Sequence, residues 1–155
     1  RILKKYSLRF GMSIIDYCFM PNHYHFLIRQ DSEKSISQFI NVFFNAYVQA
    51  VNRQQRRQGI LFEGRFKHVF VDKEEYLVHI CSYIHLNPVK AGLVKNPEDW
   101  LYSNYLEWIG ERGGEIIDQN FVIEWFDNPE EYRKFVMEGL HTEKLNIKIS
   151  QYVWD

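Results

Sequence analysis

The amino-acid sequence predicts an α+β fold, in which helices cover one face of a central antiparallel sheet. Two short apolar segments, 12–20 and 23–29, are separated by a single Pro-Asn pair, as in a hairpin. Two longer segments, 35–57 and 73–87, repeat apolar residues at helical spacing. With a further strand signal between these two helices, the order is strand, strand, helix, strand, helix. This order favours a layer of helices packed on a layer of sheet.

Length and composition narrow the class of protein. The chain has 155 residues, of which 46% are apolar and 17% aromatic, enough for one domain with a core. Its formal net charge of −1 argues against a uniformly basic surface, so any DNA contact must rely on local patches. Cys18 and Cys81 lie in apolar runs and are expected to be reduced core residues. No membrane span or leader is apparent, so the cytoplasm is the simplest location.

The first elements are a helix end and a hairpin. Residues 1–6 resemble the end of a helix that runs directly into a strand, and Arg1 is not an initiator methionine. We therefore expect an upstream strand and helix to be missing from the sequence as given. Along the second strand, alternate side chains share a face. His23 and His25 are expected on one face, and the other face is expected to enter the core through Tyr24, Phe26 and Ile28.

Capping signals set the expected limits of the two helices. Ser35 and Gln38 would form a capping box at the start of the first, and Gly59 would end it. A third strand is expected over 66–71. The second helix would begin after Asp72, with Glu75 completing its cap, and stop before Pro88.

The sequence changes character after Gly92. A short aromatic segment, 101–109, is followed by a glycine-rich joint at 110–114 and by two short helices, expected over 118–126 and 129–139. We expect one domain over residues 1–109 and a helical extension over 110–155.

Chemistry-bearing residues gather on one edge of the second helix. His79, Tyr83 and Asn87 are each one turn apart, so they can address one point, whereas His85 lies on the opposite flank. Two imidazoles on one strand face form half of a divalent-metal site. Structural explanations stay open: an isolated His-x-His is more often structural, Tyr83 could be a packing residue, and Asn87-Pro88 is an ordinary helix end.

Three motifs together carry a family resemblance. They are His23-Tyr24-His25 after Met20-Pro21-Asn22, then Gly64-Arg65-Phe66, and then the run from Tyr83 through Asn87-Pro88 to Val94. This set resembles the single-tyrosine HUH transposases, and within them the REP-associated tyrosine transposases. The resemblance covers roughly residues 12–109 and implies a ferredoxin- or RRM-like HUH fold.

The resemblance also implies cleavage and rejoining of single-stranded DNA near hairpins. Tyr83 corresponds to the catalytic tyrosine that forms a 5′-phosphotyrosine, and His23, His25 and Asn87 correspond to the metal ligands, for which we expect Mg²⁺ or Mn²⁺. His79 is placed to help deprotonate the tyrosine. The expected backbone contacts come from Arg53, Arg56, Arg57, Arg65 and Lys67, with Trp100 or Trp108 available for stacking on bases.

Two other functions stay open from the sequence. A domesticated, non-catalytic nucleic-acid-binding protein would keep the fold without the reaction. A small metal-dependent hydrolase would need a carboxylate near His23 and His25, and no obvious candidate exists, although Asp16 lies on the first strand. A nucleoid-associated monomer or homodimer fits the resemblance equally well.

Overall fold

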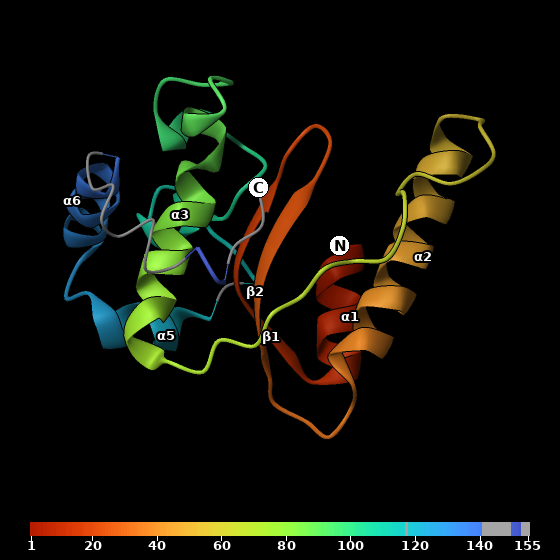
Figure 1. Ribbon diagram of the computed structural model, residues 1–155, viewed down its shortest axis with the longest axis horizontal. Helices are drawn as coiled ribbons and strands as arrows, with labels where there is room; N and C mark the ends of the chain where they lie inside the picture. Colours follow the sequence, from red (N-terminus) through yellow and green to blue (C-terminus); the bar gives the residue numbers. More distant parts are fainter. Residues whose placement is uncertain (117, 141–149, 153–155) are drawn as a thin grey trace. The chain divides into compact units, whose positions relative to one another are not determined.

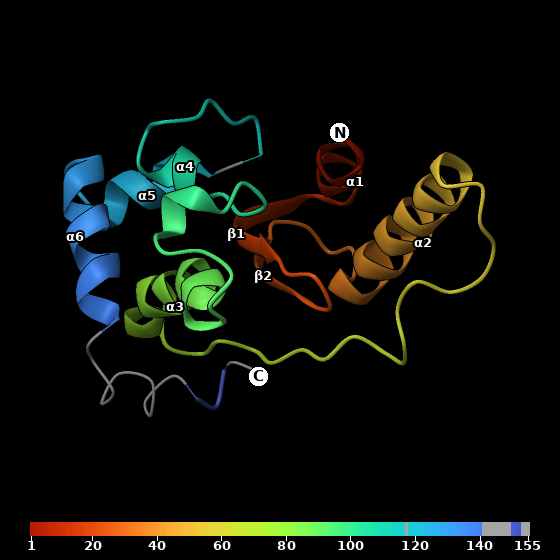
Figure 2. The same cartoon turned by 90° about the horizontal axis from the view of Figure 1, so that it is seen from above.

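The computed structural model describes residues 1–116, 118–140 and 150–152 (Figures 1 and 2). The elements follow in the order α1 (Ile2–Phe10), β1 (Met12–Phe19), β2 (Tyr24–Gln30), α2 (Ile36–Gln54), η1 (Glu74–Tyr76), α3 (Leu77–Lys90), η2 (Pro97–Asp99), α4 (Tyr105–Trp108), α5 (Gln119–Trp125) and α6 (Pro129–Gly139). The strands β1 and β2 pair as an antiparallel sheet, so the predicted α+β class is confirmed. Among these residues, no helix is both long and apolar enough to cross a membrane.

The chain divides into two compact units. The first unit comprises residues 1–13 and 29–67, and the second comprises 14–28 and 68 onward. This division differs from the expected boundary at residue 109. The helix α6 packs against α3 within the second unit, so the C-terminal helices share a unit with the middle of the chain.

In the first unit, α1 packs against α2. The Phe10 ring lies 6.0 Å from the Phe39 ring, and both side chains are buried. Gly11 ends α1 in the left-handed region, at φ 61°, which a glycine adopts without steric cost. The chain then enters β1 directly, as the N-terminal sequence predicts.

The limits of α2 differ from the prediction at both ends. Ser35 is the N-cap as expected, but its side chain accepts from the N–H of Ser37 and not from the residue three along that a capping box requires. The helix ends at Gln54, because Arg56 adopts a left-handed φ of 50°. Gly59 lies in the following loop, where its carbonyl accepts from the Asn52 amide at 2.9 Å.

The two faces of β2 differ from the expectation. Leu27, on the face of His23 and His25, is the buried residue of the strand. Tyr24, Phe26 and Ile28 are half-buried, and the Phe26 ring lies 5.4 Å from that of Phe19 on β1. The predicted core face is therefore only half-buried, and the most buried residue of the strand lies on the opposite face. The histidine face also packs on the core, which brings His25 close to α3.

The predicted third strand over 66–71 is wrong. These residues have no regular structure, and the sheet of the described part of the chain consists of β1 and β2. Phe70 is 82% exposed, so its aromatic character does not reflect burial. A strand forms where its backbone pairs with a neighbour, and β propensity alone does not supply one.

The helix α3 passes through Pro88 and ends at Lys90, not before the proline as predicted. Pro88 removes one intrahelical hydrogen bond, but its ring is buried, and the residues around it continue to pack. The Leu93 N–H donates to the Pro88 carbonyl at 2.9 Å, and Gly92, at φ 70°, turns the chain away. The cost of the proline is thus offset by tertiary packing.

A buried polar cluster anchors the inner side of α3. His85 Nε2 lies 2.9 Å from Asp16 Oδ1 on β1, and its Nδ1 lies 2.5 Å from the Tyr132 hydroxyl on α6. Both members of the ion pair have fully buried side chains, and burial raises the pKa of the Asp16 carboxyl. The Asp16 side chain is therefore buried against His85 and faces away from solvent.

The two C-terminal helices are confirmed near their predicted limits. The Asp118 side chain caps α5 by accepting from the Phe121 N–H at 3.2 Å. The Asn128 side chain caps α6 in the same way from Glu131, at 3.1 Å, and Pro129 occupies the first turn. Tyr132 brings α6 onto the core of the second unit. Cys18 and Cys81 are buried and free, as expected.

Candidate active site

The hairpin turn presents the two histidines side by side. The Met20 N–H donates to the His23 carbonyl at 2.9 Å, closing the turn before β2. The ring centroids of His23 and His25 lie 5.0 Å apart, at nearly right angles. His23 Nδ1 lies 2.7 Å from Asn22 Oδ1, an acceptor. Nδ1 is therefore the donor, and a neutral His23 keeps its Nε2 lone pair for a ligand.

The edge of α3 meets His25 as the helical spacing predicts. The Tyr83 ring lies 6.0 Å from the His25 ring, and Asn87 Nδ2 lies 3.2 Å from His25 Nε2. Since all these residues belong to the second unit, one chain supplies the imidazoles, the tyrosine and the amide. A tyrosine far from both histidines would have contradicted the predicted site.

The hydroxyl of Tyr83 is buried and has no hydrogen-bond partner among the described residues. The side chain as a whole is only 7% exposed. A buried hydroxyl without a partner costs about 1–3 kcal/mol. The buried hydroxyl of Tyr105 is unpartnered as well, so what distinguishes Tyr83 is its place beside the imidazole of His25. The site thus holds a phenol oxygen that its own fold leaves unsatisfied.

Lys90 is the residue that sequence reasoning missed. Its ammonium Nζ lies 5.0 Å from the centroid of the Tyr83 ring, and burial lowers its pKa. Because Pro88 was expected to stop the helix, Lys90 was placed outside it. Seven residues make nearly two helical turns, so Lys90 shares the edge of Tyr83 once α3 is known to continue.

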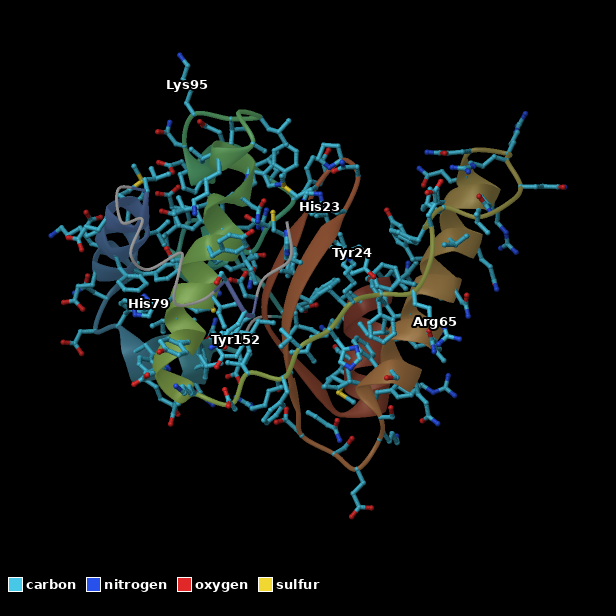
Figure 3. The ribbon with its side chains drawn as sticks, viewed as in Figure 1. His23, Tyr24, Arg65, His79, Lys95 and Tyr152 are labelled. Atoms are coloured by element: carbon cyan, nitrogen blue, oxygen red, sulfur yellow. The ribbon has the colours of Figure 1, made fainter. Side chains whose placement is uncertain are left out.

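His79 lies one turn before Tyr83 on α3, but its ring packs on α6. Its ring centroid is 5.1 Å from that of Phe135 on α6. Figure 3 shows His79 on the side of α3 toward α6, whereas His23 lies at the hairpin turn. The structure therefore brings together four of the predicted site residues and places His79 apart from them; its helper role stays a prediction.

The residues expected to hold DNA are exposed and belong to the first unit (Arg65 is labelled in Figure 3). They are Arg53, Arg56, Arg57, Arg65 and Lys67. The expected stacking role is wrong for Trp108, which is 2% exposed. Trp100 is half-buried and donates its indole N–H to the Phe19 carbonyl at 3.0 Å, while Tyr102 beside it is 64% exposed.

The ligand set limits what metal chemistry is available. Within the described residues, no three His, Cys, Asp or Glu side chains are grouped to hold an ion. A hydrolase with a carboxylate beside His23 and His25 therefore has no support there. Two imidazoles and an amide form an incomplete set that leaves positions for water or a substrate oxygen.

Comparison with known proteins identifies the family. The sequence model described as "Transposase IS200 like" matches residues 1–87, more than half of the chain. The chain belongs to the IS200-like transposases. The matched region begins at α1 and ends at Asn87, so it includes both histidines and Tyr83.

Individual relatives are consistent with this family assignment. A Haemophilus influenzae protein provisionally named REP-associated tyrosine transposase is 29% identical over 99 residues; the match covers 57% of this chain and 56% of the relative, so the chain spans about half the relative's length. A solved REP-associated tyrosine transposase bound to a REP hairpin aligns with a TM-score of 0.60 and 21% identity, over 76% of this chain and 72% of that one. The likeness to this structure confirms the fold.

Proposed function

We propose that this chain is a single-tyrosine transposase that cleaves and rejoins single-stranded DNA beside hairpins. The observation that carries the proposal is the buried, unsatisfied hydroxyl of Tyr83 next to a pair of imidazoles. Family membership supports a transposase, and the hairpin bound by the structural relative supports hairpin DNA as the partner. Such a substrate would place the protein at the nucleoid, in the cytoplasm.

The proposed reaction is a transesterification at a DNA phosphodiester. The Tyr83 oxygen attacks the phosphorus, the bond from phosphorus to the 3′-oxygen breaks, and that oxygen leaves as a 3′-hydroxyl after taking up a proton. The phenolic proton goes to water or a nearby base. The strand then carries a 5′-phosphotyrosine, and attack by the 3′-hydroxyl of another strand reverses the step without ATP.

The same residues suit a divalent ion, which we propose to be Mg²⁺ or Mn²⁺. His23 and His25 would hold it through ring nitrogens, and Asn87 through Oδ1 after a rotation of its amide. When bound, such an ion neutralises charge on the phosphate oxygens and orients the phosphate. The contact of His23 Nδ1 with Asn22, which leaves Nε2 for a ligand, and the imidazole of His25 beside Asn87 support this ligand set.

The test is the formation of a covalent protein–DNA adduct. Wild-type protein would be incubated with single-stranded hairpin oligonucleotides, including a REP hairpin, in the presence of Mn²⁺. We expect an adduct that survives denaturing electrophoresis, and we expect Tyr83→Phe to lose it. Tyr102→Phe is the matched control, because Tyr102 is an exposed tyrosine of the same unit; it should form the adduct normally.

The outcome separates catalysis from binding. If the wild-type protein binds hairpins but never forms an adduct, the chain is a non-catalytic nucleic-acid-binding protein on the same fold, and the proposal fails. An adduct that persists in Tyr83→Phe would assign the nucleophile to another residue. Sedimentation of the protein–DNA complex would show whether a monomer or a homodimer acts.

A further inference from the structure

The C-terminal residue of α3 directs a cation to the proposed nucleophile. Lys90 Nζ lies 5.0 Å from the centroid of the Tyr83 ring, and side chains on a helix point back toward its N-terminus. Lys90 therefore reaches back along the edge that also carries Asn87. The ring it covers belongs to the tyrosine whose buried hydroxyl has no hydrogen-bond partner among the described residues.

A structural role for Lys90 has to be weighed first. A cation in the last turn of a helix interacts favourably with the helix dipole, by about 0.3–1 kcal/mol, and needs no extended side chain to do so. Lys90 instead lies over the Tyr83 ring while remaining exposed to solvent. An exposed ammonium in this place can meet an anion that approaches the tyrosine from solvent.

The proposed reaction brings an anion to the Tyr83 ring. A phosphodiester attacked by Tyr83 must lie against the phenol oxygen, and its non-bridging oxygens carry a full negative charge that is redistributed in the transition state. Lys90 carries its ammonium on a flexible four-carbon stem, which from its place over the ring could turn toward those oxygens. Lys90 and the imidazole pair would then meet the phosphate from two elements, α3 and β2.

We propose that Lys90 forms a binding site for the scissile phosphate, contacting a non-bridging oxygen beside Tyr83 during cleavage and rejoining. The inference rests on the proposed function, since it needs Tyr83 to be the nucleophile. Lys90 donates hydrogen bonds as a charged ammonium and exchanges no proton in the reaction. It complements a metal ion by adding positive charge on the tyrosine side of the phosphate.

The first test compares rate with binding. Lys90→Gln keeps the length of the side chain and removes its charge, and Lys90→Arg keeps the charge. Under single-turnover conditions with a cleavable hairpin, we expect Lys90→Gln to slow adduct formation about 10- to 100-fold, with hairpin affinity changing much less. Lys90→Arg should recover part of the rate. Lys95→Gln, an exposed lysine beyond the end of α3 (Figure 3), should be unchanged.

The second test asks whether Lys90 acts on the phosphate itself. In Tyr83→Phe protein, which keeps the ring, binding would be compared for hairpins with a phosphodiester or a neutral methylphosphonate at the mapped cleavage position. In Tyr83→Phe, which retains Lys90, we expect the neutral methylphosphonate hairpin to bind severalfold more weakly than the phosphodiester hairpin. In Tyr83→Phe/Lys90→Gln, we expect the two hairpins to bind with nearly equal affinity.

The outcomes separate this inference from the proposed function. If wild-type protein forms no adduct, both fail. If wild-type protein forms the adduct and Lys90→Gln reacts at the same rate, only the inference fails. Equal sensitivity to the methylphosphonate with and without Lys90 would also overturn it, because Lys90 would then act on the structure of the helix and not on the phosphate.

Discussion

At the scale of single residues, Tyr83 shows a conflict between stability and function. Its ring packs against His25 and beneath Lys90, which favours burial, yet the same burial leaves its hydroxyl without a hydrogen bond. A residue chosen for packing alone would be a phenylalanine. The hydroxyl of Tyr105 is buried and unpartnered too, but only Tyr83 lies beside the histidine pair, where a bound phosphate or ion could use its oxygen.

This conflict predicts the effect of Tyr83→Phe on folding. Removing a buried, unsatisfied hydroxyl should leave the free energy of unfolding unchanged or raise it, by up to about 1 kcal/mol. Tyr132→Phe is the contrasting variant, because the Tyr132 hydroxyl contacts His85 at 2.5 Å; it should lose about 1 kcal/mol or more. Urea denaturation measures both. A large destabilisation by Tyr83→Phe would mean that its hydroxyl is structural.

The histidines predict a metal-dependent stabilisation of the protein without DNA. A ligand that binds only the folded state raises stability, by about 2.7 kcal/mol at 100 times its dissociation constant. We expect Mn²⁺ to raise the melting temperature of the wild-type protein and EDTA to reverse this. The double variant His23→Ala/His25→Ala should lose the shift, whereas His68→Ala, an exposed histidine, should keep it. A shift that survives the double variant would place the ion elsewhere.

At the scale of elements, α3 has two chemically different sides. Its outer edge carries Tyr83, Asn87 and Lys90 to the histidines of the hairpin. Its inner side is held through the Asp16–His85 pair, which joins the helix to β1. His85 lies between Tyr83 and Asn87 in sequence, so the inner contact fixes the rotation of the turn that presents both.

The inner pair predicts a pH-dependent loss of stability. In His85→Leu the Asp16 carboxyl stays buried without its partner, and we expect a loss of about 3–5 kcal/mol. Burial raises the folded-state pKa of Asp16, so the folded state gains stability from the bound proton at low pH and loses it as pH rises through that pKa. The contact with His85 lowers the pKa of Asp16 and so opposes the effect of burial. Removing His85 therefore raises the pKa of Asp16 further.

The loss of unfolding free energy in His85→Leu, relative to the wild-type protein, should therefore be larger at about pH 8 than at about pH 5. Urea denaturation at the two pH values would measure it. Adding Asp16→Asn removes the titrating group and should abolish the difference between the two pH values. A deficit that is the same at both, in the single and the double variant, would show that the Asp16 carboxyl is not the source of the cost.

Periodicity explains which parts of these elements the sequence could predict. The pairs His23/His25 and Tyr83/Asn87 follow from the local repeats of a strand and a helix. Lys90 was missed because a proline normally ends a helix, and only the buried contacts around Pro88 override that rule. The strand expected at 66–71 does not form, because β propensity is a local property of the sequence whereas strand pairing depends on distant residues.

At the scale of the whole molecule, the two units carry different kinds of residue. The site lies in the second unit, and the exposed basic residues Arg53, Arg56 and Arg57 lie in the first. The division itself and the Asp16–His85 pair depend on contacts between residues far apart in sequence, which no local pattern encodes. The α+β class followed from the order of local strand and helix patterns, and the family resemblance agreed with it.

The basic residues predict a salt dependence for hairpin binding. Each contact between a cation and a phosphate releases counterions, and losing one contact reduces the slope of log affinity against log salt concentration by about 1. We expect Arg53→Gln/Arg56→Gln/Arg57→Gln to reduce the slope by up to about 3, while the single-turnover rate at saturating DNA stays near that of the wild-type protein. Lys134→Gln, an exposed lysine on α6, is the control. An unchanged slope would remove these arginines from the DNA contact.

The most direct test of the central claim is to locate the covalent bond. The hairpin adduct would be digested with trypsin and nuclease and examined by tandem mass spectrometry; the peptide of interest spans residues 74–90 and contains both Tyr76 and Tyr83. The nucleotide mass is predicted on Tyr83, through its phenolic oxygen. A nucleotide found on Tyr76 or on any other residue, or cleaved DNA with no modified peptide, would contradict a site built from Tyr83 and the two histidines.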